Sequence, residues 1–365
     1  MSQIWPEWLP LREDLRSLSP YGAPQIESLA RLNTNENPYP PSPELVKAIV
    51  ERVEEVSRSL NRYPDRDALQ LRAGLATFLN ERSGMTLIAE QIWAANGSNE
   101  ILQSLFLAFG KRKALGFTPS YSMHSLIANV TGTPWVSGLR RDDFSIDIEK
   151  ASAQIREEKP QLTFLTTPNN PTGTSIPLSD IAALIKAARE VGGLMVVDEA
   201  YAEFSTESST ITLLAQYPNL VVTRTMSKAF AFAGARLGYL AADSAVVDAV
   251  QLVRLPYHLS ALTQAVALVA LDHRVELLQS VATLIRAREE MILGLEKLGV
   301  RVIPSSANFL LFTVPSSRDV WQSLLDQGVL IRDVGLSGYL RVTIGTEEEN
   351  ERFLNALSKS LGGSK

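Results

Sequence analysis

The sequence predicts an α/β fold in which a largely parallel β-sheet is covered by helices on both faces. The clearest sign is that apolar runs of strand length alternate with a longer amphipathic run between residues 162 and 224. Such alternation favours parallel strands, because each intervening helix carries the chain back to the starting edge of the sheet. A second sign is size, since 365 residues, 45% of them apolar, can bury a large core and form about two domains.

The elements of this central unit follow one another in a regular order. Residues 162–166 form an apolar run typical of a buried strand, and residues 168–173 carry the Pro, Asn and Gly that favour a turn. A helix follows the turn. Its apolar face consists of Ile181, Leu184, Ile185 and Ala188. Residues 194–197 and 220–223 are the next two predicted strands.

Three segments make up the predicted domain organisation. Residues 1–43 are rich in Pro and Asn and form an N-terminal arm, which we expect to pack against the smaller domain and a partner subunit. Residues 44–250 form the large domain, and residues 251–365 form a smaller C-terminal α/β domain. A long helical stretch from about residue 244 to 298 leads into the smaller domain, and a helix at 347–361 ends it.

Composition excludes several classes of function. The sequence contains no cysteine, so it has neither disulfides nor thiolate metal sites. The net charge of -5, with no basic stripe and no long apolar span, gives no reason to expect nucleic-acid or membrane binding. No secretory pattern begins the sequence, so we expect a cytoplasmic location. His124, His258 and His273 lack ligand spacing, and we interpret them as structural or loop residues rather than metal ligands.

Chemically capable side chains gather where the predicted strands end. Lys228 follows the strand at 220–223 and lies in apolar company, close to the Ser227 hydroxyl and the Arg236 cation. Ligands in such sheets bind at the carboxyl ends of the strands. A desolvated lysine near positive charge has a lowered pKa and becomes a usable amine nucleophile. Taken alone, however, a lysine after a strand is more often a solvated surface charge.

The neighbours of Lys228 match what pyridoxal 5′-phosphate (PLP) requires of a protein. The cofactor needs an amine for its aldehyde and a carboxylate beside its ring nitrogen, and Asp198 ends the strand at 194–197. Tyr201 and Asn170 can serve its phenolic oxygen. Two of these residues also have an ordinary structural explanation. Asp198 alone can be a helix cap, and Asn170 alone can belong to an ordinary turn.

A phosphate site is predicted at the start of a helix. Ser98 and Asn99 precede an amphipathic run, and free N–H groups at a helix start suit a phosphate, with Ser227 and Arg236 completing the nest. An ordinary Ser or Asn cap without a ligand explains the same pattern. Tyr121 can stack on the cofactor ring, although an isolated aromatic residue is more often part of a core.

The order of these motifs resembles that of class I and II aminotransferases of PLP fold type I. The strings are Asn-Asn-Pro-Thr-Gly at 169–173, Asp-Glu-Ala-Tyr at 198–201 and Ser-Lys-Ala-Phe at 227–230, followed by Gly-Ala-Arg-Leu-Gly. The resemblance implies a mostly parallel seven-stranded sheet in the large domain and a covalent imine between Lys228 and PLP. It also gives cofactor contacts to Ser98, Asn99, Tyr121, Asn170, Asp198, Tyr201, Thr225, Ser227 and Arg236.

Further segments, at 31–39, 61–65, 97–100, 330–333 and 340–346, resemble histidinol-phosphate aminotransferases, and those at 21–25 and 256–262 most resemble the actinobacterial branch of that family. This resemblance implies a homodimer in which Tyr63 reaches the cofactor of the neighbouring subunit. Arg332 and Arg341, together with Tyr21, would hold the anionic end of the substrate. The substrate-binding residues that it implies are Tyr21, Asn37, Asn170, Arg332 and Arg341.

The implied reaction exchanges an amino group between L-glutamate and imidazole acetol phosphate, giving 2-oxoglutarate and L-histidinol phosphate in L-histidine biosynthesis. Two alternatives remain within the same fold, an aromatic amino-acid aminotransferase and a phosphothreonine-type decarboxylase. A non-catalytic regulatory protein is a third, although such proteins often lose the lysine or the aspartate, and this sequence has both.

Overall fold

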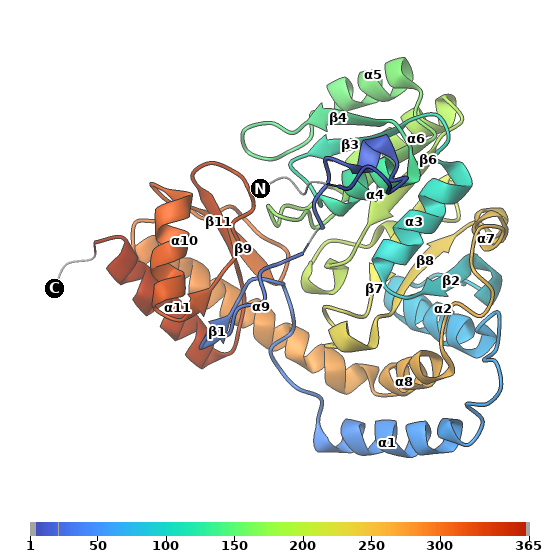
Figure 1. Cartoon of the computed structure of the whole chain (residues 1–365), viewed down its shortest axis with the longest axis horizontal. Coiled ribbons are helices and arrows are strands. Elements are labelled where there is room, and N and C mark those ends of the chain that lie inside the picture. Colours follow the sequence, from blue (N-terminus) through green and yellow to red (C-terminus); the bar gives the residue numbers. More distant parts are fainter. Residues whose placement is uncertain (1–4, 21, 363–365) are drawn as a thin grey trace.

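The structure is a computed structural model that describes residues 5–20 and 22–362. Its centre is a seven-stranded sheet in the order β2-β8-β7-β6-β5-β3-β4 (Figure 1). The strands are β2 (Ile92–Ala95), β3 (Ala114–Thr118), β4 (Trp135–Leu139), β5 (Leu162–Thr166), β6 (Leu194–Asp198), β7 (Leu220–Thr225) and β8 (Gly238–Ala242). The strands from β4 to β7 pair in parallel, and β8 runs antiparallel to both of its neighbours. The predicted α/β fold with a mostly parallel sheet is therefore confirmed.

Helices cover both faces of this sheet, because successive residues of each strand point to opposite sides. In β6, Val196 packs with α3 (Ser98–Phe109), α4 (Met123–Thr131) and α7 (Ser244–Gln251). Its neighbours Met195 and Val197 belong to the core on the other face. That core includes residues of α2 (Leu69–Ser83), α5 (Ile148–Glu158), α6 (Leu178–Glu190) and α8 (Ala261–Asp272).

The C-terminal region forms a second, smaller α/β arrangement beside the main sheet (Figure 1). Its elements are β9 (Phe309–Thr313), α10 (Ser317–Asp326), β10 (Val329–Leu330), β11 (Tyr339–Thr343) and α11 (Glu347–Ser360). Strands β9 and β11 pair antiparallel. The predicted C-terminal helix is confirmed as α11, whose first turn is fixed by a capping box between Thr346 and Glu349.

The long helical stretch predicted from about residue 244 to 298 is three helices in the structure. They are α7, α8 and α9 (Arg274–Lys297), and residues 252–260 between α7 and α8 are not helical. Pro256 lies in that break, where its ring and missing N–H disfavour a continuous helix. Helix α8 packs against α2 and α1 (Pro43–Ser57). The division at residues 43 and 250 stays our proposal.

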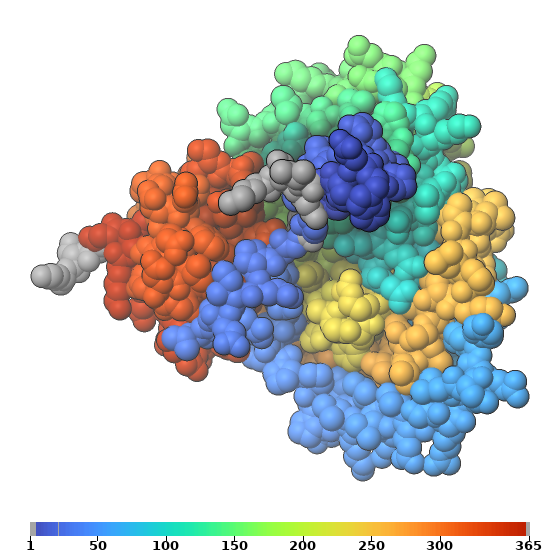
Figure 2. Space-filling model, in the orientation of Figure 1, coloured from blue at the N-terminus to red at the C-terminus, as the bar shows by residue number. Residues whose placement is uncertain are grey.

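The N-terminal segment extends across the molecule. Residues 5–20 form a dark blue knob (Figure 2), and there Arg12 donates a 2.9 Å hydrogen bond to the carbonyl oxygen of Val130 in α4. Farther along, β1 (Ala30–Arg31) pairs in parallel with β10 of the C-terminal region. This segment therefore touches both the main sheet's helices and the C-terminal region.

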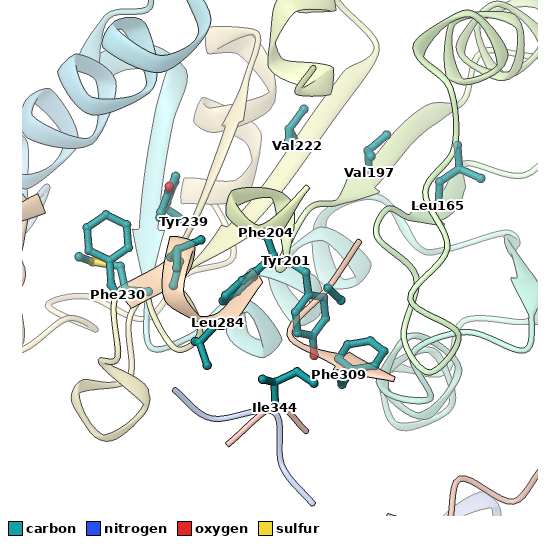
Figure 3. Packing of buried hydrophobic residues seen from close by; sticks show 14 of the residues in the cluster. Leu165, Val197, Tyr201, Phe204, Val222, Phe230, Tyr239, Leu284, Phe309 and Ile344 are labelled. Carbon is teal, nitrogen blue, oxygen red and sulfur yellow. The ribbon is translucent and has the colours of Figure 1, made fainter. Parts of the chain in front are cut away.

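The buried core continues from the main sheet into the C-terminal region. Tyr201, just after β6, meets Phe309 of β9 edge to face with ring centroids 5.0 Å apart (Figure 3). Leu284 of α9 and Ile344 after β11 belong to the same cluster. This packing sets the C-terminal region against the carboxyl edge of the sheet, so that a cavity forms between them.

Candidate functional site

A cavity of about 660 Å³ lies where strands β5, β6 and β7 end. Most of the residues predicted for the site line it, although they come from segments far apart in the sequence. They are Ser98, Asn99, Tyr121, Asn170, Asp198, Tyr201, Thr225, Ser227, Lys228, Arg236, Arg332 and Arg341. The convergence follows from the sheet, because parallel strands present their carboxyl ends at one edge.

Lys228 follows β7, and its amine belongs to the wall of this cavity. The Nζ atom donates a 2.9 Å hydrogen bond to the carbonyl oxygen of Thr34. The pKa of Lys228 is lowered to about 8, mainly by burial and next by the positive charge of Arg341, while Glu36 opposes the change and Arg236 adds to it. The direction agrees with the lowering predicted from the sequence, and with this pKa about one tenth of the amine is neutral at pH 7.

This pKa predicts how the cofactor-free protein reacts with PLP as the pH changes. Only the neutral amine attacks an aldehyde, so the rate of covalent incorporation at Lys228 should fall about tenfold per pH unit well below pH 8 and level off above it. Borohydride trapping at timed intervals, followed by peptide mass spectrometry, measures the rate. Nα-acetyl-lysine is the control, because its rate should keep rising toward its ordinary pKa of about 10.4. A profile for Lys228 that matches the control contradicts the lowered pKa.

Asp198 ends β6 with its carboxylate almost fully buried, at 2% exposure. One carboxylate oxygen accepts a 3.1 Å hydrogen bond from the backbone N–H of Ala200. The other lies 3.3 Å from Nε2 of His124, a buried residue of α4. The His124 ring stacks on Phe164 and meets the Tyr121 ring edge to face. A buried carboxylate fixed on two sides is well suited to facing a ring nitrogen.

Our interpretation of His124 as a structural or loop residue therefore missed its place beside Asp198. A useful signal was present, because His124 lies three residues after Tyr121 and both side chains can meet on one side of a helix start. The other two histidines lie elsewhere. His258 approaches the carbonyl oxygen of Ala94, and His273 lies between α8 and α9.

A hydrogen-bond network surrounds the Tyr201 hydroxyl. The hydroxyl oxygen accepts hydrogen bonds from the side-chain amides of Asn35, at 2.9 Å, and Asn170, at 3.5 Å. The side-chain oxygen of Asn170 in turn accepts a 2.5 Å hydrogen bond from Arg341, which also donates to the carbonyl oxygen of Asn33 at 2.8 Å. Sequence reasoning did not assign Asn33 or Asn35 to the site. The run of Asn residues at 33–37 was the available signal, since amides in a short segment often serve networks of this kind.

A group of donors suited to a phosphate lies at the start of α3. Ser98 begins this helix, whose first N–H groups have no partners within the helix. Gly97 before it has φ of +86°, and an added Cβ would come within 2.7 Å of the Arg236 guanidinium. Glycine is thus required where Arg236 approaches the helix start. Thr225 and Ser227 hydroxyls bond to each other at 3.0 Å on the same cavity wall.

Arg332 and Arg341 form a second cationic group in the cavity. Their backbones form an antiparallel bridge, in which the N–H of each donates to the carbonyl oxygen of the other at 3.0 and 2.9 Å. The two side chains therefore share one backbone support. A pair of guanidinium groups held in this way can bind a phosphate or a carboxylate with several charge-assisted hydrogen bonds.

Two predicted residues, Tyr63 and Asn37, do not line the cavity in the described part of the chain. Tyr63 is 80% exposed and stacks on Tyr257 with ring centroids 4.3 Å apart. The Asn37 amide donates to Ser280 in α9 at 2.9 Å, and Asn37 does not line the cavity. Tyr21 lies outside the described residues. Direct substrate contact by Asn37 or Tyr21 stays a prediction.

A buried ion cluster supports the turn that carries Asp198 and Tyr201. Arg224 of β7 contacts Glu199 and Glu203, each at 2.7 Å. Glu199 also accepts hydrogen bonds from Ser209 and from the backbone N–H of Thr210. The cluster ties the end of β6 to β7, the strand before Lys228. Sequence reasoning missed it, because neither the pairing nor the burial of these charges is visible in a single sequence.

Across residues 5–20 and 22–362, no group of three or more His, Asp or Glu side chains could hold a metal ion. Over the same ranges, every helix is too short or too polar to cross a membrane.

Comparison with known proteins places the chain among enzymes. Residues 27–357 match the family model described as aminotransferase class I and II. The histidinol-phosphate aminotransferase of Mycobacterium sp. (strain KMS) is 56% identical over 355 residues, which cover 96% of this chain and 94% of that protein. The corresponding protein of Frankia casuarinae is 55% identical over 370 residues, or 99% of this chain and 93% of that protein.

Solved structures agree with the fold. The histidinol-phosphate aminotransferase of Sinorhizobium meliloti, in complex with pyridoxal-5′-phosphate, has a TM-score of 0.84 at 23% identity and covers 97% of this chain and 98% of that chain. The enzyme of the same name from Clostridium acetobutylicum has a TM-score of 0.82 at 25% identity and covers 92% of this chain and 100% of that chain.

Proposed function

This chain belongs to the family of class I and II aminotransferases, and from that premise we propose that it is a histidinol-phosphate aminotransferase. In one direction of this reversible reaction, L-glutamate gives its amino group to imidazole acetol phosphate, and the products are 2-oxoglutarate and L-histidinol phosphate. In this role the enzyme serves L-histidine biosynthesis, and we infer a cytoplasmic location from that role. The high identity to curated relatives of this activity supports the assignment.

One observation of the cavity carries the proposal. Lys228 and Asp198 line the same cavity as two separate cationic groups, one around Arg236 and one formed by Arg332 and Arg341. A single anionic ligand needs only one such group. A cavity with two suits a phosphorylated cofactor together with an anionic substrate.

The residues of the cavity fit PLP, which is the cofactor of this family. Lys228 would hold its aldehyde carbon, Asp198 its ring nitrogen, and Tyr201 with Asn170 its phenolic oxygen. Tyr121 would cover the ring. The phosphate would bind Ser98, Asn99, Thr225, Ser227 and Arg236. When bound, PLP withdraws electrons from the substrate carbon that carries the amino group.

The chain's own groups supply orientation and proton transfer. The buried carboxylate of Asp198 keeps a proton on the facing ring nitrogen, since a nearby negative charge favours the protonated form. The Lys228 amine, with a pKa of about 8, can take a proton from the substrate carbon and return it as general base and acid. Arg332 and Arg341 hold the anionic end of either substrate, a phosphate ester in one half of the reaction and a carboxylate in the other.

Substrate comparison tests the proposed name. Holoenzyme supplied with 2-oxoglutarate should form glutamate from L-histidinol phosphate with a kcat/KM roughly 100-fold above that for L-phenylalanine, because charge-assisted contacts to the phosphate are each strong. A kcat/KM for L-phenylalanine that equals or exceeds the value for L-histidinol phosphate would replace this function with that of an aromatic amino-acid aminotransferase.

We further infer a homodimer in which Tyr63 completes the site of the neighbouring subunit. Tyr63 lies at the surface beside Tyr257, and Leu60, Leu252 and Leu255 are also largely exposed. Exposed apolar side chains of this size favour burial against a partner. The tyrosine hydroxyl would then bind the cofactor phosphate from across the interface.

Mixed dimers test this arrangement. Lys228→Ala and Tyr63→Phe subunits are unfolded together, refolded and reloaded with PLP. Each mixed dimer then holds one site with both residues intact, so random pairing should restore about one quarter of the wild-type sites. Each parent refolded alone is the control. Activity that stays at the average of the two parents contradicts a shared site.

A further inference from the structure

A small apolar cluster joins the main sheet to the C-terminal region at the rim of the cavity. Phe144, in the loop between β4 and α5, packs with Ile303 and Leu311 of the C-terminal region and is only 8% exposed. Its ring meets Tyr339 edge to face with centroids 5.6 Å apart. Figure 1 shows the loop after β4 reaching toward the β9 and β11 sheet. This cluster is separate from the two main cores.

The backbone at Phe144 is in an unusual conformation that its surroundings maintain. Its φ is +66°, in the left-handed region that large side chains rarely adopt. The buried Arg140 donates a 3.0 Å hydrogen bond to the Phe144 carbonyl oxygen, and the Phe144 N–H donates to the carbonyl oxygen of Arg141 at 2.8 Å. An unfavourable conformation that persists under such constraint points to a role for the side chain it presents.

The cluster's other members connect the two substrate-binding arginines. Val334, Leu336 and Tyr339 pack against it, and all three lie in the segment between Arg332 and Arg341. Val334 also lines the cavity. Because the backbones of Arg332 and Arg341 are bridged to each other, a shift of this segment moves the support of both guanidinium groups.

We propose that Phe144 is a positioning residue, which anchors the segment 333–339 and thereby holds Arg332 and Arg341 at the spacing that a phosphate-bearing substrate needs. This inference rests on the proposed function. The Arg341 side chain has further support, because it donates hydrogen bonds to Asn170 and to the carbonyl oxygen of Asn33. Phe144 does not line the cavity.

Phe144→Ala tests the proposal in the PLP-loaded enzyme. We expect the KM for L-histidinol phosphate to rise about tenfold, equivalent to about 1.4 kcal/mol, with kcat within about twofold of wild type. The preference for L-histidinol phosphate over unphosphorylated L-histidinol, measured as the kcat/KM ratio, should fall by the same factor. Phe144→Leu keeps an apolar side chain in the cluster, so its KM for L-histidinol phosphate should stay close to the wild-type value. Leu139→Ala, at the exposed end of β4, is the matched control and should behave as wild type.

If Phe144→Ala does not fold, Leu336→Ala is a second variant that weakens the same cluster from its opposite side. It should raise the KM for L-histidinol phosphate with little change in kcat. An unchanged KM in both variants, or an equal loss for L-histidinol and L-histidinol phosphate, overturns the positioning role. If the wild-type enzyme does not use L-histidinol phosphate, the proposed function fails instead, so the two failures are distinguishable.

Discussion

Lys228→Ala is expected to lower kcat by at least about 10³-fold in transamination between L-histidinol phosphate and 2-oxoglutarate. We propose that this amine, which lies in the cavity wall, moves the substrate proton, and a positioned general acid and base contributes about 10² to 10⁴ in rate. Loss of covalent attachment to the cofactor adds to this effect. Steady-state formation of glutamate measures the change.

Two observations separate this effect from loss of structure. The donors around Ser98 and Arg236 are untouched in the variant, so PLP should still bind, but without the visible absorbance of its covalent form with Lys228. Lys186→Ala removes an exposed lysine of α6 and should keep wild-type kcat. Activity of Lys228→Ala within tenfold of wild type, in protein with an unchanged circular dichroism spectrum, would rule out Lys228 as the proton-transfer group.

Asp198→Asn is expected to lower kcat roughly 100-fold with little effect on folding. The amide keeps the shape of the side chain and can still meet His124 and the N–H of Ala200, but it cannot favour a protonated ring nitrogen. A hydrogen bond to a charged partner is worth about 1.5 to 3 kcal/mol, which sets the size of the loss.

The absorbance spectrum of bound PLP and kcat should change together in Asp198→Asn, because both report protonation of the ring nitrogen. Asp248→Asn on the exposed face of α7 is the matched control and should alter neither. A variant with normal kcat and a normal spectrum would mean that Asp198 does not face the ring nitrogen.

The sequence predicted the sheet and the strand-end residues because their signals are local. Apolar runs such as 194–197 form strands buried on both faces, and a polar residue directly after such a run, like Asp198, lies at the sheet's carboxyl edge. The antiparallel direction of β8 was not assigned. Its connection from β7, residues 226–237, contains only one short 3-10 turn, whereas a parallel pairing usually needs an α-helix that carries the chain back across a face of the sheet.

The missed features depend on contacts between distant segments. His124 gains its position only when α4 packs against the sheet that carries Asp198, and the Arg224 cluster forms only when β6 and β7 pair. Asn35 reaches Tyr201 across 166 positions of sequence. The type of a residue shows which interactions its side chain can make, but tertiary packing decides which partner it meets.

The central proposal, that this chain transfers the amino group of L-histidinol phosphate, is tested most directly by the first half of the reaction alone. PLP-loaded enzyme is mixed with excess L-histidinol phosphate without any 2-oxo acid, and imidazole acetol phosphate is quantified. Because the enzyme itself must accept the amino group, the product should stop at about one equivalent per Lys228 and resume on addition of 2-oxoglutarate. Absence of imidazole acetol phosphate, with phenylpyruvate formed from L-phenylalanine under the same conditions, would contradict the proposal.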